Sequence, residues 1–368
     1  MFDRRLIQNF DWILLVLLAL LAAISILNLY SATHAIRNVG ESQVFVKQIY
    51  WILIGFAVLL LMTTFNYSAL ERFAYPAYFF SLGLLVLVLF VGKVTSGSQR
   101  WLSLGIVSFQ PSELAKITIL MVLAEFFSKN AGYKAYRLRD LWRPFVLIGI
   151  PTVLILKEPD LGTALILAVA SFSVILIARI NWKSLLILAL FFLALSPFIW
   201  FNLKEYQQMR ILTFLSPEMD PLGSGYHINQ SKIAIGSGLL WGKGFLKGTQ
   251  TRLHFLPEQH TDFAFSVLAE EWGFIGSTLL ILLYVFLILW GLNIAKSAKD
   301  NFGSIMAVGI VAMIFWQVVI NVGMVTGLLP VVGIPLLLFS YGGSSLVTTM
   351  AAMGLLMNIS MRRFMFSE

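Results

Sequence analysis

Apolar runs of roughly 20 residues, each long enough to cross the hydrocarbon core of a bilayer as a helix, recur from one end of this chain to the other. Only 12% of the residues are charged, which is about half the share found in soluble domains. No stretch has the composition of a separate soluble domain. We therefore predict an all-α, polytopic integral membrane protein in which residues 1–368 form a single membrane domain.

The hydropathy pattern predicts about ten transmembrane helices. One long loop, at about 203–261, separates the seventh helix from the eighth. The fifth helix is short, and Pro151 inside it predicts a kink. The expected helices lie near 11–31, 48–64, 74–92, 110–128, 143–157, 161–178, 184–202, 262–292, 303–327 and 340–360.

Basic residues are distributed unequally between the two sides of the predicted bundle. The short connections on the side of the N-terminus carry fourteen Lys and Arg, against five on the opposite side. Because short cytoplasmic loops are enriched in Lys and Arg, we expect both termini in the cytoplasm and the long loop outside. The richer side holds Arg4, Arg5, Arg72, Lys129, Lys134, Arg137, Arg139, Arg143, Arg179, Lys183, Lys296, Lys299, Arg362 and Arg363; the poorer side holds Arg37, Lys47, Lys93, Arg100 and Lys157.

This topology accounts for most of the net charge of +8. We predict no nucleic-acid partner, because the chain has no basic domain with interleaved aromatic residues. The chain has no cysteine, which excludes disulfides, thiol nucleophiles and cysteine-based metal sites. With four histidines, a bound metal would need carboxylate ligands, and the residues alone do not decide whether a metal is used.

Ionisable residues at the outer end of the fourth predicted helix require a polar surrounding, because a charge in hydrocarbon is costly unless it is paired or hydrated. In SFQPSELAKITIL, Glu113 and Lys116 stand at positions i and i+3 on one helix face. They form either a structural ion pair that lines a crevice or part of a polar cavity that orients a substrate. Both alternatives imply a cavity between helices. In nearby GSQRWLSLG, Arg100 is a candidate anion contact.

A second acidic site follows the short fifth helix. Asp160 in KEPDLGTALI stands directly before the sixth predicted helix, with Glu158 two residues earlier. Asp160 either caps that helix by accepting backbone N–H bonds or directs its carboxylate into the same cavity as Glu113.

The third acidic site is LPEQHTDFAF, where the long loop enters the eighth predicted helix. On one interpretation Thr261 or Asp262 is an N-cap, since acids near a helix N-terminus are favoured by the helix dipole. On the other, Asp262 is held at the membrane surface to deprotonate a hydroxyl group. Glu258 then holds the loop or steers charge, and His260 is a polar rim residue rather than a metal ligand.

Two further acids and a glycine-containing segment complete the polar features of the outer half. Glu270 and Glu271 lie deeper in the eighth predicted helix; Glu270 is placed to share the same cavity, whereas Glu271 points toward another helix. Lys116 and Arg210 are candidate partners for these acids. GIPLLLFSYGGSS reads as a broken segment that enters the last helix, where Ser344 offers a hydroxyl and the backbone either packs tightly or binds phosphate.

Several of these segments together resemble the signature segments of the SEDS family, the shape, elongation, division and sporulation proteins. They are FQPSELAKI, KEPDLGTALI, YHINQSKIAIGSGLLWGKGF, LPEQHTDFAFSVLAEEWGFIG and GIPLLLFSYGGSS, and they occur in the family's order over nearly the whole chain. LWGKGFLKGTQTRLHFLPEQHTDFAF is more similar to the elongation branch of the family than to the division branch. Ala264 stands where a bulkier apolar residue is usual, a departure that touches no proposed acid or base.

The resemblance implies a ten-helix peptidoglycan polymerase. Such proteins join lipid II disaccharides into glycan strands at the outer face of the bacterial cytoplasmic (inner) membrane and release undecaprenyl pyrophosphate. They work with a class B penicillin-binding protein, which is a transpeptidase, and with other membrane proteins of the elongation complex.

The resemblance also assigns roles to residues of this chain. Asp262 matches the essential catalytic aspartate of the family's HTDF-type motif. The other matched positions line the central cavity or belong to the functionally important outer loop; they are Glu113, Lys116, Asp160, Arg210, Gln230 and Glu258.

The expected reaction is attack of a sugar hydroxyl on C1 of a glycan carried by polyprenyl pyrophosphate, with Asp262 as general base. Candidates to stabilise charge on the leaving pyrophosphate are Arg100, Arg210, Lys116 or a divalent cation, Mg²⁺ or Mn²⁺. The polyprenyl tail requires an apolar groove open to lipid.

Two other functions compete with this one. A flippase for lipid-linked oligosaccharide also suits intramembrane charges and broken helices, but the clustering of charges in the outer half speaks against it. A non-catalytic scaffold for a penicillin-binding protein is the third alternative.

Overall fold

The computed structural model describes residues 8–34, 43–95, 98–104, 107–130, 136–178, 180–216, 220, 223–253, 255–256 and 258–363. Five basic residues that entered the topology prediction lie outside these ranges: Arg4, Arg5, Arg37, Lys134 and Arg179.

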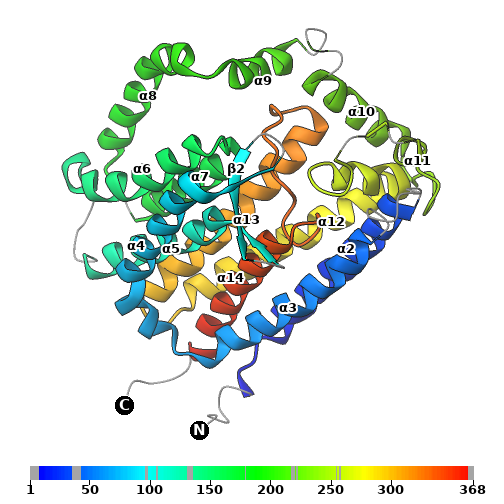
Figure 1. Ribbon diagram of the computed structural model, residues 1–368. Helices are drawn as coiled ribbons and strands as arrows, with labels where there is room; N and C mark the ends of the chain where they lie inside the picture. Colours follow the sequence, from blue (N-terminus) through cyan, green and yellow to red (C-terminus); the bar gives the residue numbers. More distant parts are fainter. Residues whose placement is uncertain are drawn as a thin grey trace.

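Within the described part of the chain, ten long helices follow one another in the order expected from hydropathy (Figure 1). Six of them, α2, α3, α4, α12, α13 and α14, are long and apolar enough to cross a membrane, and α7 and the first part of α8 are shorter apolar helices. The predicted all-α, polytopic membrane fold is confirmed. The ten are α2 (Trp12–His34), α3 (Val44–Thr64), α4 (Tyr67–Val91), α5 (Pro111–Lys129), α6 (Trp142–Lys157), α7 (Leu161–Ile177), α8 (Trp182–Asn202), α12 (Ala264–Lys296), α13 (Asn301–Thr326) and α14 (Gly343–Arg362).

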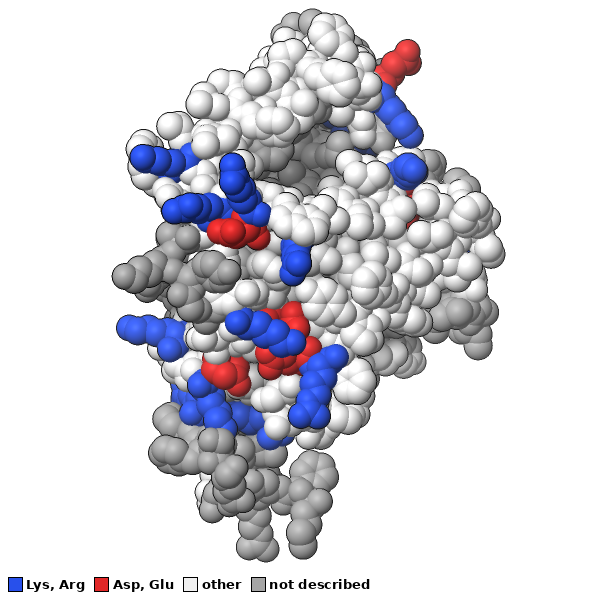
Figure 2. Space-filling model, turned by 90° about the vertical axis from the view of Figure 1, so that its left-hand side faces the viewer, with Lys and Arg blue, Asp and Glu red and all other residues white. Residues whose placement is uncertain are grey.

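Most residues of α13 and α14 are buried, and these two helices lie inside the bundle. α14 packs on α3, while α13 packs on α5, α7 and α12. The outer helices α3, α4 and α12 carry exposed apolar side chains such as Leu53, Phe79 and Leu282, as a membrane-facing surface requires. On the face shown in Figure 2, charged side chains gather in patches that are separated by broad uncharged surface.

The beginning of α2 and the end of α14 meet on one side of the bundle. Asp11 caps α2 by accepting the backbone N–H of Leu14. The same carboxylate accepts the Ser360 hydroxyl, near the end of α14, and the Trp290 indole N–H, near the end of α12. An even number of membrane crossings places the two ends on the same side in this way.

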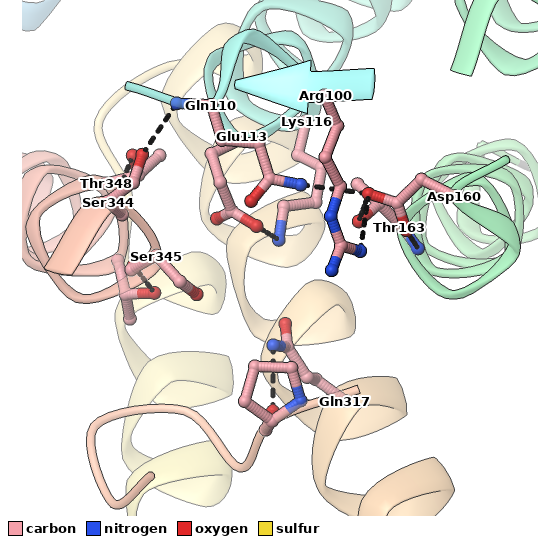
Figure 3. A network of polar contacts seen from close by, with 12 residues as sticks. Arg100, Gln110, Glu113, Lys116, Asp160, Thr163, Gln317, Ser344, Ser345 and Thr348 are labelled. Atoms are coloured by element: carbon pink, nitrogen blue, oxygen red, sulfur yellow. Dashed lines mark hydrogen bonds and ion pairs between the residues drawn. The ribbon is translucent and has the colours of Figure 1, made fainter. Parts of the chain in front are cut away.

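The chain between α4 and α5 forms a small antiparallel sheet, which the hydropathy pattern did not predict. Its strands β1 (Lys93–Thr95), β2 (Ser98–Leu104) and β3 (Val107–Phe109) pair in the order β1-β2-β3. β2 carries Arg100 toward the beginning of α5 and α7 (Figure 3).

The long loop predicted at about 203–261 is itself partly helical. It contains α9 (Glu205–Leu215), α10 (Ser224–Ser237) and α11 (Thr249–Arg252). α10 packs on α12 and α13, whereas α8 and α9, in green, stand off from the central helices in Figure 1.

α12 is interrupted at Gly273, whose φ of 65° is a left-handed conformation that favours glycine. The loop between α10 and α11 fills the interruption. The backbone N–H of Phe274 donates to the carbonyl of Leu239, and the carbonyl of Glu270 accepts the backbone N–H of Lys243. The loop therefore replaces hydrogen bonds that the break removes from the helix.

Between α13 and α14 the chain runs as a non-helical stretch, residues 328–342, which we call the re-entrant segment. Side chains of surrounding helices bond its carbonyls: Ser25 of α2 donates to Phe339, and Gln48 of α3 donates to Ser340. Non-helical backbone at membrane depth is tolerated only where other groups satisfy it in this way. The re-entrant segment forms one wall of the site.

Candidate active site

A cavity of about 580 Å³ lies at the end of the bundle opposite the paired helix ends. Its walls come from β2, the beginnings of α5 and α7, α9, the turn before α12 and the re-entrant segment. It brings together six of the nine side chains that the sequence singled out. These charged lining residues are Arg100, Glu113, Asp160, Arg210, Glu258 and Asp262.

Asp262 lies in the turn that precedes α12 and is partly exposed to the cavity. The N-cap of α12 is Phe263, which makes no side-chain cap bond, so neither Thr261 nor Asp262 has the capping role. The Thr261 hydroxyl instead donates to Glu258 at 3.0 Å. The Asp262 carboxylate faces the re-entrant segment, because a β-carbon added at Gly333 would lie 3.4 Å from its Oδ2.

The surroundings of Asp262 change its acidity. Burial, and then the negative charge of Glu258, raise the pKa of Asp262 to about 6, while Arg100 and Arg210 act in the opposite direction. A carboxyl group with this pKa is ionised at neutral pH and is a stronger base than an ordinary aspartate, which matches the requirement for a general base.

Asp160 combines the two roles that the sequence left as alternatives. Its Oδ1 caps α7 by accepting the Thr163 backbone N–H at 3.1 Å. Its Oδ2 accepts the Gln110 side-chain amide at 2.9 Å and lies 3.6 Å from an Arg100 guanidinium nitrogen (Figure 3). The capping bond from Thr163 therefore fixes the Asp160 carboxylate, which in turn holds the Arg100 guanidinium in the cavity.

Glu158, two residues earlier, is fully buried. Burial, and then the charge of Asp160, raise the pKa of Glu158 to about 8. At neutral pH the group is therefore mostly uncharged and adds little negative charge beside Asp160.

Glu113 and Lys116 form the ion pair expected from their spacing, with 2.9 Å between Glu113 Oε1 and Lys116 Nζ (Figure 3). Both side chains are almost fully buried. Glu113 lines the cavity and Lys116 does not, so the ion pair lies in the wall of the site and only its acid reaches the cavity.

Besides Lys116, two more of the nine predicted side chains lie outside the cavity lining. The Ser344 hydroxyl accepts the backbone N–H of Gln110 at 3.2 Å, and its neighbour Ser345 lines the cavity in its place. Gln230 belongs to α10 and is not part of the lining.

The expectation that Glu270 shares the cavity is wrong. Its carboxylate accepts hydrogen bonds from Lys243, Thr249 and the Thr251 hydroxyl, and so organises the loop around α11. Neither Lys116 nor Arg210 is among these partners. Glu271 meets another helix as expected, because it accepts the Ser31 hydroxyl of α2.

The sequence did not predict several residues that line the cavity, because nothing in their local sequence indicates a polar site. Gln110 is one: it precedes Pro111 at a helix start, a position that signalled only a helix boundary. Tyr341 is another; its backbone N–H donates to the carbonyl of His260 at 2.9 Å, which joins the re-entrant segment to the loop that carries Asp262.

The described residues contain no group of three or more His, Asp or Glu side chains that would hold a metal ion. No metal ligands are assigned among them.

An apolar groove of about 390 Å³ adjoins the cavity. It runs between α6 and α7 on one side and α8 and α9 on the other, and Leu161 belongs to both linings. The upper part of the face in Figure 2 is visibly hollowed. The groove is lined by Leu156, Leu161, Leu195, Phe198, Asn202, Leu203, Lys204 and Gln207.

Comparisons with known proteins agree over nearly the full length. A family model described as a cell cycle protein and named for FtsW, RodA and SpoVE matches residues 10–364. The peptidoglycan glycosyltransferase MrdB of Escherichia coli K12 is 44% identical, over 96% of this chain and 94% of that protein. The peptidoglycan glycosyltransferase RodA of Treponema pallidum is 33% identical, over 98% of this chain and 99% of that protein.

Solved structures are similar over the same length. A chain of a peptidoglycan synthase complex that coordinates polymerization and crosslinking superposes with a TM-score of 0.82 and 34% identity, over 96% of this chain and 98% of that chain. The rod shape determining protein RodA of Thermus thermophilus superposes with a TM-score of 0.72 and 32% identity, over 97% and 98%.

Proposed function

This chain belongs to the SEDS family of FtsW, RodA and SpoVE, and from that premise we infer how its cavity works. The chain is a RodA-type peptidoglycan glycosyltransferase that polymerises lipid II into glycan strands. We propose that the whole chain acts as one membrane domain and that Asp262 is the general base. The observation that carries this proposal is a carboxylate of raised pKa, partly open to a cavity with two guanidinium groups.

In the proposed step, the acceptor sugar hydroxyl attacks C1 of the lipid-linked donor. The new O–C1 bond forms while the bond between C1 and the pyrophosphate oxygen breaks, and undecaprenyl pyrophosphate leaves with the electron pair. Asp262 takes the hydroxyl proton and later returns it to water in the cavity. Proton transfer of this kind contributes about 10²–10⁴-fold to a rate.

Charge on the departing pyrophosphate needs nearby cations. Arg100 and Arg210 line the cavity and are the side chains we assign to this role. Asp160 orients Arg100 through their 3.6 Å contact. Lys116 stays paired with Glu113 and supports the wall of the site.

The apolar groove beside Leu161 is the proposed place of the polyprenyl tail. Its lining is mostly Leu and Phe, with three polar residues, Asn202, Lys204 and Gln207. A tail in the groove and a sugar in the cavity place the pyrophosphate between them.

The membrane setting is proposed on the same basis. Both termini are cytoplasmic and the cavity is extracytoplasmic, in the bacterial inner membrane, as the distribution of Lys and Arg indicates. The proposed partners are a class B penicillin-binding protein and other membrane proteins of the elongation complex. The similar chain in a synthase complex that polymerises and crosslinks supports the first of these.

The test is polymerisation of lipid II by the purified Asp262→Asn variant. The substitution keeps the shape of the side chain and removes its basicity, so we expect a rate loss of about 10²–10⁴-fold. Glu205→Gln, which alters an exposed acid at the beginning of α9, is the control and should retain the wild-type rate. A folded Asp262→Asn variant that polymerises at the wild-type rate would refute the assignment.

A further inference from the structure

Asn321, near the end of α13, is fully buried and bonded to two separate parts of the site. Its side-chain amide nitrogen donates to the backbone carbonyl of Asp262 at 3.0 Å and to that of Ile334 at 2.7 Å. Its own Oδ1 has no hydrogen-bond partner among the described residues. The amide therefore acts there as a double donor.

The two bonded carbonyls belong to two different segments that border the cavity. One is in the turn that carries Asp262, and the other is in the re-entrant segment. Gly333, the residue before Ile334, faces the Asp262 carboxylate and has a φ of 71°, which favours glycine. One amide group thus fixes the backbone of Asp262 relative to the wall that its carboxylate faces.

Gln317 offers a comparison within the same helix. It lies one turn earlier, is also buried, and its amide donates to the Pro335 carbonyl at 3.1 Å (Figure 3). Its Oε1 likewise has no partner within the described part of the chain. Within the described part of the chain, Gln317 therefore bonds to the re-entrant segment alone, whereas Asn321 bonds to both the re-entrant segment and Asp262.

A second asparagine bonds to the backbone on the other side of the same turn. Asn28 of α2 donates its amide to the carbonyl of Ala264 at 3.0 Å. The backbone on either side of Phe263 is thus held from α2 and from α13, each of which packs on α12.

We propose that Asn321 is a positioning residue for the transfer reaction: it sets the place of the Asp262 carboxylate against the re-entrant segment. The proposal rests on the proposed function, in which Asp262 is the base. Loss of the amide leaves two buried carbonyls without a donor at a cost of about 1–3 kcal/mol each, which removes the bonds that fix the two segments. A displacement of about 1 Å at a reacting group can reduce a rate about 10²-fold.

The experiment compares Asn321→Leu with Gln317→Met, two substitutions of similar size that each remove one buried amide. Polymerisation of lipid II is measured across a pH range, together with KM and the unfolding temperature. For Asn321→Leu we expect kcat to fall by about 10–100-fold with KM changed less than about threefold. The acid limb of its pH profile should also move from the wild-type value, because the carboxyl has new surroundings.

For Gln317→Met we expect an acid limb at the wild-type pH and a fall in kcat no greater than about threefold. A purely structural role for Asn321 would lower the unfolding temperature of both variants and leave both acid limbs in place, and that result overturns the proposal. Asn321→Gln, which keeps the donor but lengthens the arm, should recover part of the lost kcat.

Two further arms keep the result decisive. If Asn321→Leu is not recovered folded, Asn321→Ser takes its place, because serine is too short to reach both carbonyls. The same changes in kcat, KM and the acid limb are then expected. Asp262→Asn is measured alongside. If it retains activity, the proposed base is wrong; if it is inactive while Asn321→Leu keeps the wild-type kcat and limb, only the positioning role is wrong.

Discussion

At the scale of single residues, the chemistry of the cavity depends on how two acids and two arginines are spaced. Burial, and then the charge of Glu258, raise the pKa of Asp262, while Arg100 and Arg210 lower it. The outcome is a carboxyl with a pKa of about 6. With Asp262 as the proposed base, its ionised form is lost as the pH falls through 6, so activity should rise with pH over that range.

Glu258→Gln tests this balance. Removing the negative charge removes one of the causes that raise the pKa of Asp262, so the acid limb of kcat/KM should move to lower pH. The limb is measured from initial rates of lipid II polymerisation in buffers of constant ionic strength. Glu205→Gln should leave it in place, and a limb that moves upward in Glu258→Gln would contradict the electrostatic account.

Lys116→Met tests the buried ion pair. Both partners are almost fully buried, and removing one partner of such a pair costs about 3–5 kcal/mol because the other charge stays uncompensated. Lys129→Met is the comparison: Lys129 pairs with Glu125, which is as buried as Glu113, but the Lys129 side chain itself is 64% exposed, so its loss should cost less than the loss of Lys116. Chemical or thermal unfolding in detergent measures both, and equal losses would show that burial of the Glu113 pair has no energetic consequence.

At the scale of elements, the sequence predicted the helices well because an apolar run of membrane length has one stable structure in lipid. It did not predict β1–β3 or the helices within residues 203–261, because these are short and depend on contacts with the bundle. The same limit explains the error at Glu270. Helical spacing placed Glu270 beside Asp262. In the structure, the loop that fills the break at Gly273 donates hydrogen bonds to the Glu270 carboxylate instead.

Site residues could be predicted where a charge stood out against an apolar background. Asp262, Asp160 and Glu113 were found in this way, and all three line the cavity. Asn321 and Gln110 were not, because a single amide in an apolar helix or before a proline carries no chemistry until the fold supplies its partner.

Gly273→Ala tests the interrupted helix. A β-carbon there would lie 2.3 Å from the Gly242 backbone nitrogen, and the φ of 65° disfavours any side chain. We expect strong destabilisation of the junction between α12 and its loop, seen as a lower unfolding temperature and lost activity. Gly83→Ala in α4 has no atom within 4 Å of the new carbon and should be neutral or slightly stabilising. Equal effects in the two variants would mean that the interruption is not constrained.

At the scale of the whole molecule, the cavity and the groove together fit a substrate with a sugar in water and a tail in lipid. The central helices α13 and α14 support the re-entrant wall, while α8 and α9 bound the groove from outside. In the proposed arrangement, the cavity beside the buried centre takes the sugar and the groove beside the outlying pair of helices takes the tail.

Lipid II analogues with shortened tails test this arrangement. Each buried methylene contributes about 0.8 kcal/mol, so a tail too short to fill the groove should raise KM with little change in kcat. Leu195→Trp, which narrows the groove, should raise KM for the long-tailed substrate more than for the short one. If KM does not change with tail length or with Leu195→Trp, the tail does not bind in this groove.

The most direct measurement is the pH dependence of kcat/KM for lipid II polymerisation by the wild-type chain and by Asp262→Asn. We predict a wild-type rate that is half-maximal near pH 6, following the pKa of Asp262, and a small residual rate in Asp262→Asn from which this limb is absent. A wild-type profile that stays flat for about one pH unit on each side of 6, or a limb that persists in Asp262→Asn, would contradict the assignment of Asp262 as the base.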